Sequence, residues 1–495
     1  MIRRLTFILL FLGQLHYGKC QTPYTEPYRP QLRFSPKAHW MNDPNGMVYF
    51  KGIYHLFFQY YPDSTVWGPM HWGHATSKDL LHWKEQPIAL FPDSLGYIFS
   101  GSAVIDINNT SGFGKPGKIP LVAIFTQHDP IGEKEGTNHF QNQSIAYSTD
   151  GGIQWQKYQY NPVLKTPGLK DFRDPKVIWY PELKEWMMIL AAGDRVMFYS
   201  SANLKSWKKE SEFFTKYGAH GGVWECPDLM SFIVNQKRVW VLFVSINPGG
   251  FQGGSATQYF TGRFDGHRFT PNDTILRWID YGPDNYAGVT WSNTGRQKIF
   301  LGWMSNWLYG TKTPTETWRS AMTIPRSLDL KFIGQHYFLT MQPIQGLNAL
   351  VKDSNNFKTL SSYNNYYLSG LNRLDFSISD LQSFTFMFTN VSGQKLLLGF
   401  DKTKNSFFID RRAAGKSDFD SEFARVYYAK RIAFTKSSNI SIVLDRSSVE
   451  LFADGGLTTM TEIFFSDQPF DKLQIVPLLK TITNLKISTF NSIWQ

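Results

Sequence analysis

Three acidic side chains stand out, because each lies in a short motif that fixes the direction of a carboxylate. Asp43 and Asp174 are each followed by proline, which disfavours helical backbone at the preceding residue and predicts extended geometry for both acids. Glu225 lies in a third motif, Trp224-Glu225-Cys226-Pro227. Each motif alone is equally typical of a turn or a strand end. Together they supply the carboxylates that nucleophilic and acid–base catalysis require.

Carboxylates that meet in one pocket repel one another, so the pKa of at least one of them is expected to rise. One carboxyl group then stays protonated while another stays ionised. Glycoside hydrolysis uses this pair of states, because one group protonates the leaving oxygen while the other attacks the sugar or activates water. The predicted chemistry requires a fold that brings three distant positions together.

Three similar segments indicate a repeated hairpin that positions these motifs. Residues 77–83, 148–155 and 201–207 each begin with serine, contain a turn-forming Asp or Asn, and end in tryptophan, and residues 263–269 are a fainter copy. A strand-like run precedes each segment, so each predicts one hairpin whose aromatic residue packs the next strand. The irregular repeat is typical of β-propeller blades with insertions.

The repeats stop after Pro325, and a second domain is predicted from there. Strand-like runs at 384–388, 396–400 and 447–453 follow one another, the last closed by Asp454-Gly455-Gly456, which predicts antiparallel hairpins in a β-sandwich. We place the boundary between residues 330 and 350. The high aromatic content of 16% also favours strands, so the predicted fold class is all-β.

The N-terminus has the order of a secretory signal peptide. A basic start is followed by a short apolar run and small residues, which predicts cleavage after Cys20 and an extracellular protein. The apolar run is too short to span a membrane. Cys226 is then the one cysteine left, so no internal disulfide is expected. Six sequons are candidate glycan acceptors in a secreted eukaryotic chain: Asn108, Asn109, Asn142, Asn272, Asn390 and Asn439.

Charge argues against nucleic-acid binding. Loss of Arg3, Arg4 and Lys19 with the signal lowers the formal net charge from +11 to +8, and no run of four basic residues occurs.

His71 and His74 form a local pair of side chains that can bind metals. We nevertheless expect no metal and no organic cofactor.

The complete set of motifs resembles glycoside hydrolase family 32, the β-fructofuranosidases. The resemblance runs from Trp40-Met41-Asn42-Asp43-Pro44-Asn45-Gly46 through Arg173-Asp174-Pro175 and Glu225-Cys226-Pro227 to Ser448-Val449-Glu450-Leu451-Phe452. It implies a five-bladed β-propeller catalytic domain over residues 25–335, followed by a β-sandwich over residues 345–495.

The resemblance also implies roles for the acids. Asp43 is expected to be the nucleophile, Glu225 the acid/base and Asp174 the transition-state stabiliser, with fixed negative charge matching an oxocarbenium-like centre. Expected substrate-binding residues combine polar groups with aromatic platforms suited to sugar rings: Asn42, Gln59, Trp67, Phe99, Ser100, Arg173, Cys226, Asp284, Tyr286 and Trp303. Cys226 is interpreted as a neighbour that shapes the surroundings of Glu225. Asn285 replaces the family's usual aromatic residue before Tyr286.

The predicted function is a secreted, retaining β-fructofuranosidase acting on sucrose and related fructosides. Three alternatives stay open: a carbohydrate-binding protein without catalysis, a fructosyltransferase that favours a sugar acceptor over water, and another five-bladed glycosidase such as an arabinanase.

Overall fold

The computed structural model describes residues 24–358, 360, 365–477 and 481–494. The predicted signal peptide, including Cys20, lies outside these residues. Strands dominate, and the one α-helix of the described chain is α1 (Pro130–Lys134). Within the same ranges, no helix combines the length and apolar character needed to cross a membrane.

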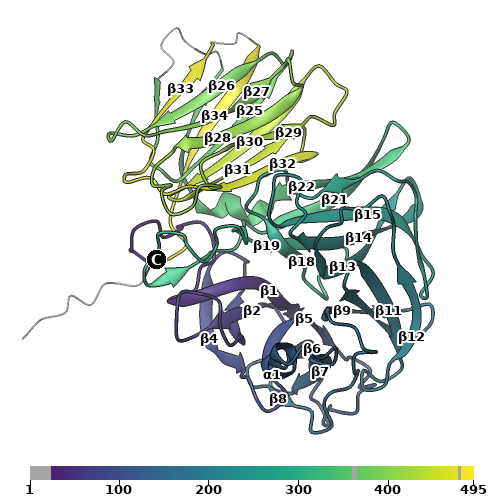
Figure 1. Ribbon diagram of the computed structural model, residues 1–495. Helices are drawn as coiled ribbons and strands as arrows, with labels where there is room; N and C mark the ends of the chain where they lie inside the picture. Colours follow the sequence, from purple (N-terminus) through teal and green to yellow (C-terminus); the bar gives the residue numbers. More distant parts are fainter. Residues whose placement is uncertain (1–23, 359, 361–364, 478–480, 495) are drawn as a thin grey trace, which may run out of the picture.

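The N-terminal domain is a ring of five sheets, the blades of a propeller, antiparallel except for one short parallel pairing in the first (Figure 1). The first blade contains β1 (His39–Phe50), β2 (Ile53–Tyr61), β3 (His71–Ser77) and β4 (Trp83–Leu90), with β20 (Trp318–Arg319) beside β1. The second contains β5 (Tyr97–Ile105), β6 (Leu121–His128), β7 (Gln141–Ser148) and β8 (Gln156–Lys157). The third contains β9 (Phe172–Tyr180), β10 (Glu185–Ala192), β11 (Arg195–Ser201) and β12 (Lys208–Phe213).

The last two blades complete the ring. The fourth contains β13 (Val223–Val234), β14 (Lys237–Asn247), β15 (Ala256–Phe264) and β16 (Phe269–Pro271), with β17 (Arg277–Trp278) paired to β15. The fifth contains β18 (Tyr286–Thr290), β19 (Lys298–Trp303), β21 (Arg326–Ile333) and β22 (His336–Pro343). A backbone bridge between Val48 and Ser292 joins the first and fifth blades. The last strand of the fifth blade ends at Pro343, whereas the sequence predicts that the propeller domain ends at residue 335.

The serine-to-tryptophan segments form the outer hairpins of the first three blades, as predicted. They connect β3 to β4, β7 to β8 and β11 to β12. In the first, Ser77 Oγ accepts the Leu80 N–H at 2.9 Å and Asp79 Oδ1 accepts the Leu81 N–H at 3.0 Å. Asn203 takes the place of Asp79 in the third blade. The side chain closes the turn, which is why Asp and Asn are interchangeable here.

The C-terminal domain is a sandwich of two six-stranded sheets, above the propeller in Figure 1. A short 3₁₀ turn, η1 (Gln345–Leu350), leads into it. One sheet contains β23 (Val351–Phe357), β34 (Ile482–Phe490), β25 (Asn372–Ile378), β30 (Ser438–Asp445), β31 (Ser448–Ala453) and β32 (Thr458–Ile463). The other contains β24 (Asn365–Tyr367), β33 (Lys472–Val476), β26 (Phe384–Thr389), β27 (Lys395–Asp401), β28 (Ser406–Ala413) and β29 (Val426–Lys430). Alternate residues of β26, Phe384, Phe386 and Phe388, point into the shared core.

Buried charges join the two domains. Arg411 of the sandwich donates to Asp284 Oδ2 at 2.6 Å and to the Tyr309 hydroxyl at 2.9 Å, and all its side-chain atoms are hidden from solvent. A second group links Arg326 to Asp280 and Glu450. Charges this deeply buried require complete pairing, so the sandwich and propeller are fixed against each other.

We expect Arg411→Met to lower the free energy of unfolding by about 3–5 kcal/mol, because it leaves the buried Asp284 carboxylate without its cation. The matched control is Arg412→Met, whose side chain is 62% exposed and paired to Asp410. Loss of that surface pair should cost less than about 1 kcal/mol. Denaturant midpoints of both variants test this expectation, and equal shifts would contradict it.

Candidate active site

The innermost strand of each blade begins at the same mouth of the propeller, and each contributes one polar side chain there. These side chains are Asp43 on β1, Ser100 on β5, Asp174 on β9, Glu225 on β13 and Tyr286 on β18. All five strands show a break in pairing register at or beside these positions. Such bulges re-aim side chains, here toward the central axis.

The bulges change one expectation from the sequence. Asp174 has a φ of 65° and Cys226 a φ of 45°, which is left-handed backbone. The predicted extended geometry is therefore wrong for Asp174, because the bulge sets its backbone despite the following proline. An aspartate tolerates this conformation better than most residues.

Two side chains donate hydrogen bonds directly to Asp43, and a third orients one of them. Ser100 Oγ donates to Asp43 Oδ2 at 2.6 Å, and Asn42 Nδ2 donates to Asp43 Oδ1 at 3.0 Å. Trp40 Nε1 donates to Asn42 Oδ1 at 2.7 Å, which fixes the orientation of that amide. Burial raises the pKa of Asp43 and the nearby Glu225 charge adds to the increase, while these hydrogen bonds oppose it.

Asp174 is the most buried of the three acids, with a side chain 6% exposed. Its Oδ2 accepts the backbone N–H of Cys226 at 3.0 Å, and its own N–H donates to Thr126 Oγ1 at 3.0 Å. Burial raises the pKa of Asp174 to about 7; the neighbouring Glu225 and Asp43 charges act in the same direction, and Arg173 opposes them.

One carboxylate oxygen of Glu225 accepts hydrogen bonds from a guanidinium group, and the other accepts one from a phenol hydroxyl. Its Oε1 accepts from Arg173 at 3.0 Å and 3.2 Å, and its Oε2 accepts from the Tyr286 hydroxyl. Arg173 also contacts Asp171 at 2.7 Å. Burial disfavours the guanidinium charge, but Glu225, Asp174 and Asp171 outweigh this effect, so the pKa of Arg173 is raised.

The Cys226 thiol brings two of the acids together. Its Sγ lies 3.5 Å from Asp43 Oδ2 and 3.5 Å from Asp174 Oδ2, so these oxygens are within twice that distance of each other. Burial and the three surrounding carboxylates raise the pKa of the thiol. Cys226 is therefore a neutral donor between Asp43 and Asp174, next in the chain to Glu225.

Aromatic side chains surround the cluster. Trp303 and Tyr286 pack together with Trp40 in one buried group, and Phe99 is half-buried beside the exposed Trp67, with ring centroids 6.1 Å apart. Among the described residues, two buried donors of the predicted set have no protein partner: Gln59 Nε2 and Trp303 Nε1.

The structure does not bring Asp284 into the cluster. It is fully buried, its Oδ1 accepts from Tyr309 at 2.6 Å, and its Oδ2 accepts from Arg411 at 2.6 Å. Its carboxylate belongs to the interface with the sandwich, although Tyr286, two residues later, reaches Glu225.

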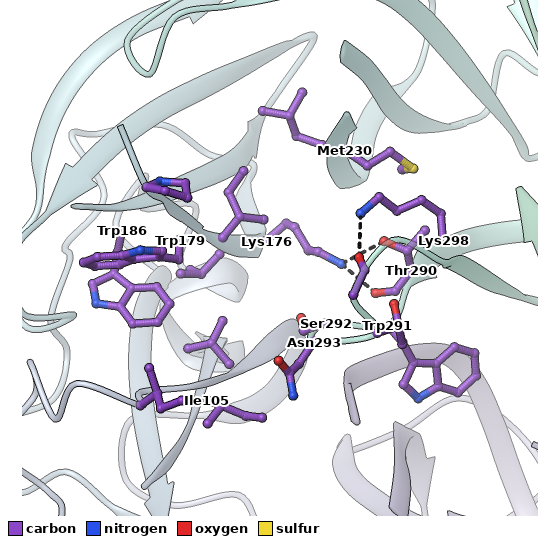
Figure 2. Close-up of a pocket in the computed structure, with 18 of the residues that line it drawn as sticks. Ile105, Lys176, Trp179, Trp186, Met230, Thr290, Trp291, Ser292, Asn293 and Lys298 are labelled. Carbon is purple, nitrogen blue, oxygen red and sulfur yellow. Dashed lines mark hydrogen bonds between the residues drawn. The ribbon is translucent and has the colours of Figure 1, made fainter. Parts of the chain in front are cut away.

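Beneath the acids, a buried polar group divides the central channel. Lys176 Nζ donates to the Thr290 carbonyl at 2.7 Å and to Asp228 Oδ2 at 3.2 Å. Behind it, a cavity of about 840 Å³ opens at the opposite mouth, lined by Trp179, Trp186 and Lys298 among others (Figure 2). Lys176 and Thr290 border both sides, so this group separates the rear cavity from the acids.

Several contacts at the site were not anticipated from the sequence. Thr126, Gln141 and Asp228 all accept hydrogen bonds from β9, the strand that carries Asp174. Gln141 and Thr126 lie in no local motif. Lys176 and Asp228 lie just beyond the register breaks of β9 and β13, so simple strand alternation does not predict which way they face. In the described part of the chain, no group of three His, Cys, Asp or Glu residues is arranged to hold a metal.

We expect Asp174→Asn to stabilise the protein by about 1–3 kcal/mol at pH 7.5 and much less at pH 4. With a raised pKa, Asp174 binds its proton more tightly in the folded chain than in the unfolded one, so wild-type stability falls as pH rises from about 4 to about 7. Asparagine carries no charge in this window. Melting curves of the wild type and of Asp174→Asn at both pH values test the sign of this pH dependence. An equal shift in melting temperature at the two pH values would contradict it.

Carboxyl groups that meet at one mouth of a propeller are the groups that glycoside hydrolysis uses, and the fold is a two-domain all-β fold. The family model described as "Glycosyl hydrolases family 32 N-terminal domain" matches residues 33–343, and "Glycosyl hydrolases family 32 C terminal" matches residues 347–489. The chain belongs to glycosyl hydrolase family 32.

Individual relatives agree along most of the chain. A levanase from Bacillus subtilis is 46% identical over 91% of this chain and 68% of its own length. An extracellular exo-inulinase from Aspergillus awamori is 42% identical over 89% of this chain and 90% of its own. The crystal structure of an A. awamori exo-inulinase superimposes with a TM-score of 0.88 at 38% identity, covering 96% of this chain and all of that one. A fructofuranosidase from Schwanniomyces occidentalis complexed with fructose gives a TM-score of 0.87 at 32% identity, covering 95% of this chain and all of that one.

Proposed function

We propose that the protein is a secreted β-fructofuranosidase that removes terminal β-D-fructosyl units by a retaining double displacement. The observation that carries the proposal is the convergence of Asp43, Asp174 and Glu225, linked through the Cys226 thiol and Arg173. These residues are separated by long stretches of chain, so their meeting at one mouth supports a common task.

In the first step, Asp43 attacks the anomeric C2 of the fructosyl unit as the bond from C2 to the leaving oxygen breaks. Glu225 transfers its proton to that oxygen, so the first product leaves as an alcohol and a covalent fructosyl-enzyme is formed. Ser100 and Asn42 aim the Asp43 carboxylate. Asp174 stabilises the positive charge that develops on the ring, because its oxygen lies fixed beside the nucleophile.

In the second step, the Glu225 carboxylate removes a proton from water, and the hydroxide attacks C2 as the bond to Asp43 breaks. Fructose leaves with its anomeric configuration retained, and Glu225 is again protonated. This route requires the Asp43 and Glu225 carboxyl groups to lie closer together than in an inverting enzyme, where water is the nucleophile and needs room between the base and the sugar.

Sucrose is the proposed substrate, together with raffinose and short fructans. The second candidate is an exo-acting fructanase, which is favoured by the relatives named levanase and exo-inulinase. The exposed Trp67 beside Phe99 offers an apolar platform at the rim for the sugar on the leaving side.

Initial rates on sucrose, raffinose, inulin and levan distinguish these candidates. Release of glucose and fructose from sucrose at rates above those on the polymers supports the first. Faster release of fructose alone from inulin or levan supports the second. Sugar binding without turnover would overturn the enzyme proposal, activity on arabinan alone would overturn the substrate class, and kestose in excess of free fructose would indicate a transferase.

Secretion is proposed from the N-terminal segment and from relatives named extracellular. N-terminal sequencing of the protein recovered from culture medium tests it. The expected first residue is Gln21, and retention of the intact chain inside the cells would contradict secretion.

A further inference from the structure

A line of side chains runs from the surface of the second blade to Glu225. Arg173, which holds Glu225, also reaches Gln141 Oε1 at 3.4 Å. Gln141 Nε2 lies 3.3 Å from His128 Nδ1, and His128 Nε2 lies 3.1 Å from Glu133 Oε2 on α1. Gln141 and His128 face each other across β6 and β7, where the two residues are paired.

The hydrogen bonds of Gln141 determine the tautomer of His128. Gln141 Oε1 accepts the backbone N–H of Phe172 at 2.8 Å, and a backbone N–H can only donate. The oxygen end of the amide is therefore fixed, and its NH₂ end faces His128. Since an NH₂ group only donates, His128 Nδ1 accepts, and the ring proton sits on Nε2, where it donates to Glu133.

His128 is enclosed on all sides. Its side chain is 3% exposed, and its ring stacks on Phe99 with centroids 4.3 Å apart and an angle of 5°. Phe140 meets its edge at 5.5 Å, and Tyr97 lies at 6.1 Å. The titratable groups that face it are Tyr97 on β5, Asp129 before α1, Glu133 on α1 and Arg173 on β9.

Burial lowers the pKa of His128, and the Arg173 charge lowers it further, while Glu133 and Asp129 oppose this. The neutral form that Gln141 requires is therefore also the form that the surroundings favour. Geometry and electrostatics agree on one protonation state near neutral pH.

We propose that neutral His128 is a positioning residue which, through Gln141, holds Arg173 in place against Glu225. This inference rests on the proposed function, since it assigns Glu225 a proton-transfer role. Protonation of His128 places an N–H on Nδ1, facing the NH₂ group of Gln141. The amide must then move or rotate, and rotation turns its NH₂ toward the Phe172 N–H and the Arg173 guanidinium. Arg173 loses one of the contacts that fix it, and activity falls as pH decreases.

Two substitutions of His128 separate positioning from packing. Asparagine keeps an acceptor near the Nδ1 position and does not titrate, so His128→Asn should retain kcat on sucrose at pH 7 within about threefold. His128→Leu fills space without an acceptor, so its kcat should fall by about 10-fold or more, with KM nearly unchanged. Equal kcat values for the two variants would overturn the proposal.

A charge on the surface provides a second test that does not disturb the buried ring. Glu133→Gln removes the charge that favours protonated His128. Asp43 and Asp174, whose pKa values are raised, contribute to the acid limb of kcat in every variant, so the part caused by His128 is the difference from His128→Asn. This difference should move to lower pH by about half a unit. Glu135→Gln removes another exposed charge two residues further along, at the C-cap of α1, and should move that difference much less. Equal shifts in the two variants would overturn the proposal even if His128→Leu fails to fold.

These outcomes are separate from the failure of the proposed function. If wild-type protein does not hydrolyse fructosides, or if Glu225→Gln retains full activity, the proposed function fails. If wild-type protein is active and Glu225→Gln is not, the His128 and Glu133 variants test positioning alone.

Discussion

Asp43→Asn is expected to lower kcat on sucrose by about ten-thousandfold or more, because it removes the nucleophile while keeping the shape of the side chain. Asn42, Ser100 and Cys226 all contact the Asp43 carboxylate, and an amide oxygen retains part of this pattern. The fold should therefore survive. Initial rates and melting curves of the purified variant check both expectations.

A matched control exists within the repeats. Asp79→Asn changes the same atoms in the outer turn of the first blade, where Asn203 already does the equivalent task in the third. This control should keep wild-type activity. Substantial turnover by Asp43→Asn, or an equal loss in both variants, would show that Asp43 is not the nucleophile.

Glu225→Gln is expected to reduce kcat on sucrose by about a thousandfold and to reduce the rate of the first step with an aryl β-fructofuranoside far less. Sucrose loses a poor leaving group that needs a proton, whereas a phenolate leaves without one. Glutamine can still accept from Arg173 with its oxygen, and its NH₂ can donate to Tyr286, so both contacts of Glu225 have replacements.

The dependence on leaving group is the decisive part of that prediction. Burst kinetics with a nitrophenyl fructoside separate the first step from the second, which also requires Glu225 as base. The same fractional loss for good and poor leaving groups would contradict the acid role. A melting temperature of Glu225→Gln equal to that of the wild type would exclude a general loss of structure.

The repeated turns carried enough information to predict the architecture. A serine, an Asp or Asn, and a tryptophan at constant order close the same hairpin in three blades, because the side chain itself forms the turn. Family 32 membership is confirmed over both domains. The number of blades came from the resemblance, since the fifth blade has no copy of the turn.

The structure places the three acids that the combined motifs singled out at one mouth of the propeller, and their roles stay predictions. The bulge that turns Asp174 to a positive φ depends on pairing with β10, which no local motif shows. Asp284 was expected at the site because Asp284-Asn285-Tyr286-Ala287 resembles a segment of the family. Its partner, Arg411, comes from the other domain, more than a hundred residues later.

The residues proposed to position other side chains lie in no recognisable sequence motif. Gln141 and His128 stand at the facing ends of paired strands, and their roles follow from strand register and from a fixed backbone N–H. Such contacts arise only when distant segments are placed in three dimensions.

The central claim is that Asp43 forms a covalent bond to the fructosyl unit. Incubating Glu225→Gln with an aryl β-fructofuranoside should accumulate this intermediate, because the first step proceeds and the second lacks its base. Mass spectrometry of the acid-quenched, digested protein should find one anhydrofructosyl addition on the peptide that contains Asp43. An addition on the peptide containing Asp174, or product release without any adduct and with inverted configuration, would contradict the account.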